Sequence, residues 1–66
     1  MEYDLLVMFT DGFGKIVTGV TEYGVNPNTN CAFYVKNKHQ SFMPLATLQF
    51  IGRAFDYYGS SEYGDL

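Results

Sequence analysis

Cys31 and His39 are the residues of this 66-residue chain whose types could combine for catalysis or metal binding. A thiol beside an imidazole can act as a nucleophile with its general base, and both side chains are zinc ligands. The residues around His39 offer no carboxylate to orient its ring. A structural zinc site needs about four Cys or His ligands, and the chain has one of each. We therefore expect no catalytic residue, no metal and no cofactor, and we expect that the protein is not an enzyme.

The segment Asp11-Gly12-Phe13-Gly14 could begin a dinucleotide-binding loop, in which glycines let the backbone approach a phosphate. The third glycine of that pattern is missing, and the following Lys15-Ile16-Val17 is typical of a strand and not of a helix. Asp-Gly after a strand favours a primed hairpin turn, because glycine accepts a positive φ angle. We interpret the segment as such a turn.

Acidic residues and tyrosines gather near both ends of the chain. Tyrosine combines a large apolar ring with a polar tip and is enriched in binding surfaces. Chain ends often lie close together in small domains, so these residues could form one acidic aromatic surface that engages a basic groove on a partner protein. The candidate partner-binding residues are Tyr3, Asp56, Tyr57, Tyr58, Glu62, Tyr63 and Asp65.

The charge balance bounds the class of partner. Seven acids against four bases give a net charge of −3, and the bases are spread along the chain, which disfavours nucleic-acid binding. The chain contains no run of 18 apolar residues, so we expect no membrane-spanning segment. The first residues lack the basic segment and apolar run of a signal peptide. We therefore expect a cytoplasmic protein in which Cys31 is a reduced thiol.

The first expected strand covers residues 2–10 and is apolar on both faces. One face carries Tyr3, Leu5, Val7 and Phe9, and the other carries Leu6 and Met8. A strand of this kind must be covered on both sides. Either a second chain covers Leu6 and Met8, which predicts a homo-oligomer, or the C-terminal segment of the same chain does.

Residues 15–24 are rich in β-branched side chains and predict a second strand, in which Gly19 marks a bulge or a bend. Residues 25–30 predict a hairpin loop, because they combine three asparagines with a proline. In a third strand, 31–36, alternation predicts that Cys31, Phe33 and Val35 face the core. We expect Phe33 and Val35 to be buried together with Leu48 and Phe50.

Residues 41–58 allow two interpretations that decide the architecture. In the first, a short turn near Pro44 leads into a final strand at 47–52, and the protein is all-β: a small bent antiparallel sheet or SH3-like barrel of four or five strands. In the second, the spacing of Leu45, Leu48, Ile51 and Phe55 indicates a helix over about 44–58. The protein is then α+β, with three antiparallel strands and one helix. We favour the all-β fold.

We expect a single domain over residues 1–58, followed by an acidic, tyrosine-containing tail over 59–66. Proteins of this size that lack enzyme motifs, such as those of phages and mobile elements, commonly act by stoichiometric binding. The sequence therefore favours a small inhibitor or adaptor that binds a cellular protein. The alternatives are an oligomeric small-molecule or nucleotide binder with a pocket between subunits, and a small-barrel nucleic-acid binder whose exposed aromatic residues stack on bases.

Overall fold

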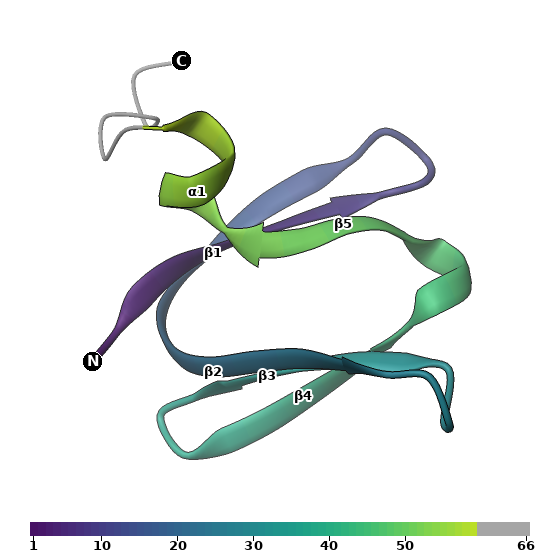
Figure 1. The fold of residues 1–66 in the computed structure, drawn as a ribbon, viewed down its shortest axis with the longest axis horizontal. Helices are drawn as coiled ribbons and strands as arrows, with labels where there is room; N and C mark the ends of the chain where they lie inside the picture. The colour runs from purple at the N-terminus through teal and green to yellow at the C-terminus, as the bar shows by residue number, and fades with distance from the viewer. Residues whose placement is uncertain (60–66) are drawn as a thin grey trace.

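Five strands form one antiparallel sheet in the computed structural model, which describes residues 1–59 (Figure 1). The strand order is β4-β3-β2-β1-β5. The all-β prediction is confirmed, and the α+β alternative is wrong. The elements are β1 (Tyr3–Phe9), β2 (Gly14–Asn26), β3 (Cys31–Lys36), β4 (His39–Pro44), the 3₁₀ turn η1 (Leu45–Thr47), β5 (Leu48–Arg53) and the short helix α1 (Ala54–Tyr58).

The long strand β2 bends the sheet into two halves (Figure 1). Its first part pairs with β1 and its second part with β3. Between Tyr3 and Leu5 of β1 the facing residues of β2 change from Val20 to Val17, so β2 contains one extra residue there. Gly19 lies in this bulge with φ 74°, a conformation that glycine adopts without steric cost. The predicted bend at Gly19 is confirmed.

The turn at Asp11-Gly12 is in the predicted place but is of a different type. The Gly12 N–H donates to the Phe9 carbonyl at 3.1 Å, and the Phe13 N–H donates to Asp11 Oδ1 at 3.0 Å. Gly12 has φ 94°, whereas Asp11 is not among the non-glycine residues with positive φ. A primed turn needs its positive φ angle at the first central residue, so the positive φ of Gly12 instead fits a turn that ends in a glycine bulge. A two-residue primed turn occurs at Asn37-Lys38, where φ is 52° and 64°.

The core lies on the concave side of the bent sheet. Its buried members are Leu5, Val7, Val20, Ala32 and Met43. The predicted inward face of the first strand is confirmed, since Tyr3 and Phe9 also pack against this cluster.

The predicted inward face of β3 is wrong. Ala32 is fully buried and Tyr34 packs against the core, so Phe33 and Val35 lie on the convex side, only half-buried. Side chains from β1, β2 and β4 already fill the interior, so a methyl group suffices at position 32. Phe50 is also on the convex side. It pairs with Met8, which follows the inward-facing Val7 and therefore faces the opposite side of the sheet. Leu48 and Ile51 pack against the core, so Phe33, Val35, Leu48 and Phe50 do not form one cluster.

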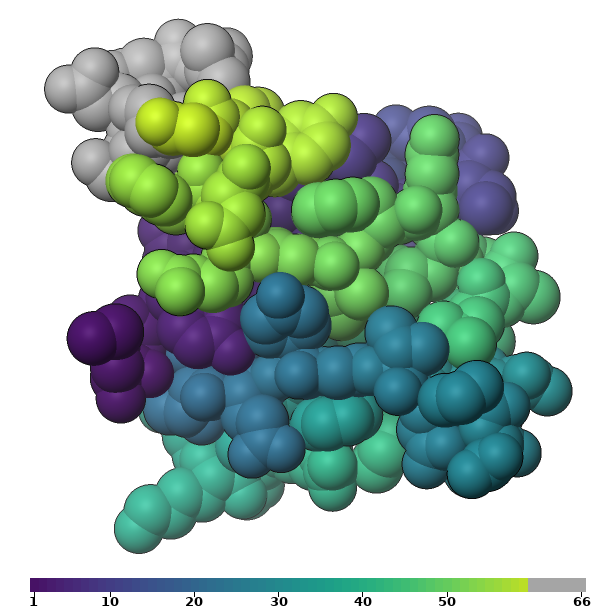
Figure 2. Space-filling view, in the orientation of Figure 1, coloured from purple at the N-terminus to yellow at the C-terminus, as the bar shows by residue number. Residues whose placement is uncertain are grey.

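The helix α1 covers the convex side of β1 and β5, against which it packs. Leu6 is only 4 % exposed, and Tyr58 lines the same groove as Leu6 and Met8. Among the two alternatives for covering Leu6 and Met8, the C-terminal segment of the same chain takes this place. The homo-oligomer was predicted because a second chain could cover Leu6 and Met8, and α1 of the same chain covers them instead. In the space-filling view α1 forms a ridge beside β5, on the side of the molecule away from β3 and β4 (Figure 2).

Candidate functional site

The five-residue helix α1 presents three large aromatic side chains at the surface. Phe55 and Tyr57 are each 50 % exposed and Tyr58 is 37 % exposed. The helix ends where Gly59 adopts φ 74° and its N–H donates to the Phe55 carbonyl at 2.7 Å, which is a common helix C-cap. We call Phe55, Asp56, Tyr57 and Tyr58, together with Phe50 beneath them, the α1 surface.

Tyr57 is held in place by ring contacts on both sides. Its ring centroid lies 5.0 Å from that of Phe50, at an interplanar angle of 58°. It also lies 4.9 Å from the Tyr58 ring, at 79°. Tilted and edge-to-face geometries of this kind are the favoured ones for aromatic pairs. Tyr57 and Tyr58 are therefore packed against each other, and Tyr57 is also packed against the sheet.

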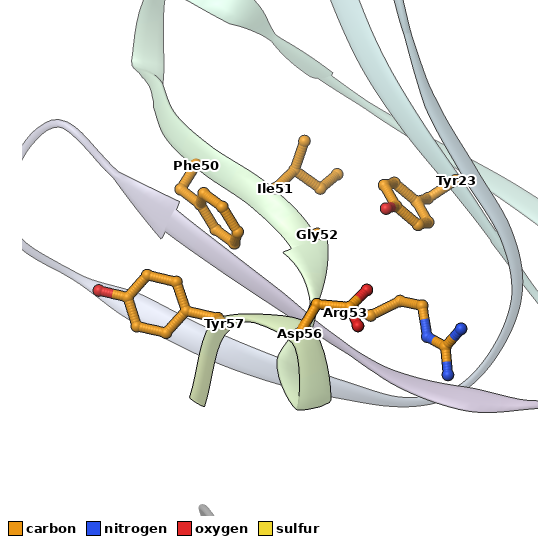
Figure 3. Close-up of a pocket in the computed structure, with 7 residues that line it drawn as sticks. All are labelled: Tyr23, Phe50, Ile51, Gly52, Arg53, Asp56 and Tyr57. Carbon is orange, nitrogen blue, oxygen red and sulfur yellow. The ribbon is translucent and has the colours of Figure 1, made fainter. Parts of the chain in front are cut away.

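A groove of about 420 Å³ lies on one side of α1 (Figure 3). In Figure 3 the Phe50 and Tyr57 rings lie on one side of Gly52 and the Tyr23 ring lies on the other. A Cβ atom on Gly52 would be 2.8 Å from the Phe50 ring, so the missing side chain leaves room for this ring. We call this the arginine groove. Its lining is Tyr23, Phe50, Ile51, Gly52, Arg53, Asp56 and Tyr57.

A second groove, of about 410 Å³, borders α1 at Tyr58. Its lining is mostly apolar and contains one cation, Lys15. We call this the leucine groove. Its lining is Leu6, Met8, Gly14, Lys15, Ile16 and Tyr58. The two grooves place concave apolar surface beside both exposed tyrosines, which is where a partner's side chains could insert.

Tyr3 lies next to the arginine groove, beneath the Arg53 side chain. The Arg53 Cζ atom is 5.0 Å from the Tyr3 ring centroid, a cation–π distance, and the Tyr3 and Tyr23 rings meet edge to face at 6.0 Å. Burial is the main reason that the pKa of Tyr3 lies above its usual value; Tyr23 and Glu22 raise it further, whereas Arg53 lowers it. Arg53 Nε is buried and has no hydrogen-bond partner within residues 1–59. Arg53 thus links Tyr3 to the groove.

The structure brings part of the predicted partner-binding set together. Asp56, Tyr57 and Tyr58 share α1, which packs against the strand that carries Tyr3. Tyr3 itself points to the concave side and is half-buried under Arg53. The other predicted members, Glu62, Tyr63 and Asp65, lie outside the described residues.

The predicted partner-binding set contains neither Phe50 nor Arg53, and of the leucine-groove lining it contains only Tyr58. Phe50 was assigned to the core because it shares strand parity with Leu48. One sequence signal could have indicated that Phe50 lies on the other face. Gly52 is two residues further along the same face of the strand, and its missing side chain leaves space for the large Phe50 ring. The leucine groove gives no local signal, because its residues come from three separate elements.

Cys31 and His39 do not form a site. Cys31 pairs with Pro44, and Lys36 pairs with His39, so the two lie at opposite ends of the β3–β4 hairpin. Cys31 and Lys36 are five residue steps apart on β3, which corresponds to about 17 Å at ~3.4 Å per residue. A thiol–imidazole dyad is therefore excluded by geometry.

Within residues 1–59, no group of three His, Cys, Asp or Glu side chains is placed to hold a metal ion. The same part of the chain contains no helix that is both long and apolar enough to cross a membrane. Comparison of the chain with protein-family models, with curated proteins and with solved structures found no match in any of the three.

Proposed function

We propose that this protein is a non-enzymatic interaction module that binds a cellular protein stoichiometrically through the α1 surface. One observation carries the proposal: a helix of five residues exposes Phe55, Tyr57 and Tyr58 between two grooves. Exposed apolar patches on small proteins commonly mark interaction sites. The function that this suggests is that of a small cytoplasmic inhibitor or adaptor, of the kind that phages and mobile elements encode.

The packing of Tyr57 supports its role as an anchor. A side chain that is already held by Phe50 and Tyr58 loses little conformational entropy when a partner covers it. Tyrosine is also among the residues whose truncation costs most at interfaces. We expect Tyr57 and Tyr58 to carry much of the binding free energy, and the residues that line the grooves to complete the fit.

The negative charge of the protein favours a partner with a basic surface. The net charge is −3, and Asp56 lies at the rim of the arginine groove among aromatic residues. An acidic aromatic surface suits a basic groove, such as a nucleic-acid site on the target. Attraction between exposed charges is screened over about 8–10 Å at physiological ionic strength, so partner binding should weaken as salt is raised.

A small-molecule binder is the second candidate, and one observation favours it. The arginine groove has a volume of about 420 Å³ within a single chain, which lies in the range of ligand sites. The groove contributes one cation, Arg53, and its guanidinium lies over Tyr3. A single cation is a weak site for a nucleotide's phosphates, so we rank this function below protein binding.

The test is comparative capture from a lysate of the native host, followed by titration of the purified partner. The wild type and Phe13→Ala, which truncates a 74 % exposed ring in the β1–β2 turn, should retain the partner. Tyr57→Ala/Tyr58→Ala should lose it by at least ~100-fold in affinity, as expected for two anchors. Equal retention by all three proteins would contradict the α1 surface. A small molecule that co-purifies in native mass spectrometry would favour the second candidate.

Kinetics can separate the charge contribution from the anchor contribution. Replacing Asp56, Glu62 and Asp65 by their amides should slow association more than it speeds dissociation, whereas Tyr58→Ala should mainly speed dissociation. If removal of residues 56–66 leaves the affinity unchanged, the binding site must be sought elsewhere, first at the Asn26–Asn30 loop and the Lys36–His39 turn.

A further inference from the structure

The strand β4 is a free edge of the sheet. Within residues 1–59 it stands at the end of the strand order and pairs with β3 alone. The two-residue turn at Asn37-Lys38 makes Lys36 and His39 the closing pair of the hairpin. Because hydrogen-bonded and non-hydrogen-bonded pairs alternate in antiparallel strands, the backbone groups of Gln40 and Phe42 point away from β3. They form a row of donors and acceptors to which another strand can pair.

The convex side of this edge is apolar. Phe33 and Phe42 are directly opposite each other, and Phe42 is 65 % exposed. Phe33 also pairs with Gly24 of β2, and a Cβ atom on Gly24 would be 2.8 Å from its ring. The Phe33 ring therefore lies over the position of the missing side chain, as in other cross-strand aromatic–glycine pairs. An apolar strip thus crosses β2, β3 and β4 and ends at the free edge.

This edge has little of the usual protection against strand pairing. Soluble proteins shield edge strands with charged side chains, prolines, bulges or covering elements, and within residues 1–59 β4 has only Pro44 of these, at its last position. β4 contains no Asp, Glu, Lys or Arg, and its register with β3 is uninterrupted. The opposite edge strand, β5, carries Arg53 and is covered in part by α1.

We propose that a second copy of this chain pairs with β4 across a two-fold axis, antiparallel, so that the two sheets become continuous. The edge is compatible with this occupant, because it carries no charged residue and its outward backbone groups can pair with those of an identical antiparallel strand. Two copies with a net charge of −3 each repel where acidic surface meets acidic surface, but antiparallel pairing of β4 with itself places no like charges opposite each other. It also brings the two exposed Phe42 rings to the same side of the joined sheet. The interface is isologous, as in most homodimers.

The size of the interface predicts a reversible dimer. A strand of six residues spans about 20 Å. One strand pair with one ring per chain buries less than the roughly 1,200 Å² of standard interfaces. We expect dissociation in the micromolar range. The homo-oligomer then forms at β4 and not at Leu6 and Met8, which α1 covers.

Sedimentation velocity from about 1 to about 200 µM tests the proposal in the range where such dimers dissociate. The wild type should shift from monomer to dimer. Phe42→Lys, which places two cations on the same side of the joined sheet near the axis, should remain monomeric throughout. Gln40→Pro removes an outward N–H at an edge position where proline is tolerated, and should weaken dimerisation at least ~10-fold. Phe13→Lys makes the same change at the distant, 74 % exposed Phe13 and should dimerise like the wild type.

Circular dichroism should show that all four proteins are folded, because the altered side chains are exposed. Loss of the dimer in Phe42→Lys but not in Phe13→Lys supports the proposal. A wild type that stays monomeric at the highest concentration overturns it, as does a dimer that survives both β4 substitutions. If β4 instead pairs with a strand of another protein while the free chain stays monomeric, the second copy is the wrong occupant.

The outcome is separable from that of the proposed function. Phe42→Lys leaves the α1 surface unchanged, so partner binding should persist in a monomeric variant. Added salt should weaken binding of the basic partner but leave dimerisation unchanged or stronger, because it screens repulsion between the acidic copies.

Discussion

The convex side of the sheet has two halves that resemble each other in sequence and differ in their surroundings. On β1 and β5 it carries Leu6, Met8 and Phe50, which α1 covers. On β3 and β4 it carries Phe33 and Phe42, which no element within residues 1–59 covers. In each half a glycine lies against a phenylalanine ring: Gly52 with Phe50, and Gly24 with Phe33.

This difference shows what apolar alternation can and cannot report. Alternation identifies an apolar face of a strand, but it does not distinguish burial within the chain from exposure at an interaction surface. In this fold the covering helix follows β5 directly, so it reaches the half of the sheet that contains β5 and its neighbour β1. The apolar surface of the other half is left uncovered within residues 1–59.

The largest expected effect separates the concave core from the convex side. Leu5→Ala removes a fully buried side chain and should cost about 2–5 kcal/mol, enough to unfold much of a domain of this size. Phe33→Ala should cost less, about 1–2 kcal/mol, because the ring is half-buried on the convex side. Urea denaturation of both variants measures the difference. Equal losses would mean that Phe33 belongs to the core after all.

The second comparison is within the convex side. Leu6→Ala should cost about 2–3 kcal/mol, because Leu6 is 4 % exposed under α1. Phe42→Ala should change the free energy of unfolding by less than about 0.5 kcal/mol, as most exposed substitutions do. The measurement is chemical denaturation of the monomer at low protein concentration. A large decrease in the free energy of unfolding for Phe42→Ala under these conditions would show that the convex side of β3 and β4 contributes to folding.

The two glycines sharpen the comparison. In Gly52→Ala and Gly24→Ala the new methyl group would approach a phenylalanine ring to 2.8 Å. Phe50 is held by Tyr57 at 5.0 Å, so Gly52→Ala should cost about 1–3 kcal/mol through overpacking. Phe33 borders open solvent on the convex side and can move, so Gly24→Ala should cost about 1 kcal/mol or less. Thermal unfolding of both variants decides; the reverse order would show that the Phe50 ring is the freer of the two.

The smallest expected effect concerns Tyr3. Its pKa in the folded protein is raised, chiefly by burial, so the folded state holds the hydroxyl proton more tightly than the unfolded state. The stability that this contributes is present below the unfolded pKa and is lost as pH rises through the folded pKa. Wild-type stability should therefore fall relative to Tyr3→Phe above about pH 10. Parallel denaturation curves at pH 8 and pH 11 measure this; a constant difference between the proteins would contradict it.

Much of the strand framework could be predicted from the sequence. β-branched residues, the glycine bulge at Gly19 and the turn after Pro44 are local signals, and each lies where expected. The inward face of β3 could not be predicted, because both of its faces can pack and the choice depends on the volume left by other strands. The helix α1 was missed as a separate element, since a helix of five residues is not stable alone and depends on packing against β1 and β5.

The candidate site shows the same division. Asp56, Tyr57 and Tyr58 stood out by composition, which does not depend on the fold. Phe50 and Arg53 belong to β5, which directly precedes α1, whereas Tyr23 comes from β2, a strand that is distant in the chain and does not pair with β5. A single sequence carries no local mark of such a groove.

The pairing of β1 with β5 has a consequence for how the protein folds. Leu5 faces Arg53 in that ladder, whereas the β1–β2, β2–β3 and β3–β4 hairpins join segments that are close along the chain. Contacts of such long sequence separation form slowly, because loop-closure entropy must be overcome first. During synthesis, Leu6 is made long before the segment that covers it, so it stays exposed until residues 48–58 have emerged. The α1 surface is therefore completed last, and a chain that has not finished folding cannot yet present it to a partner.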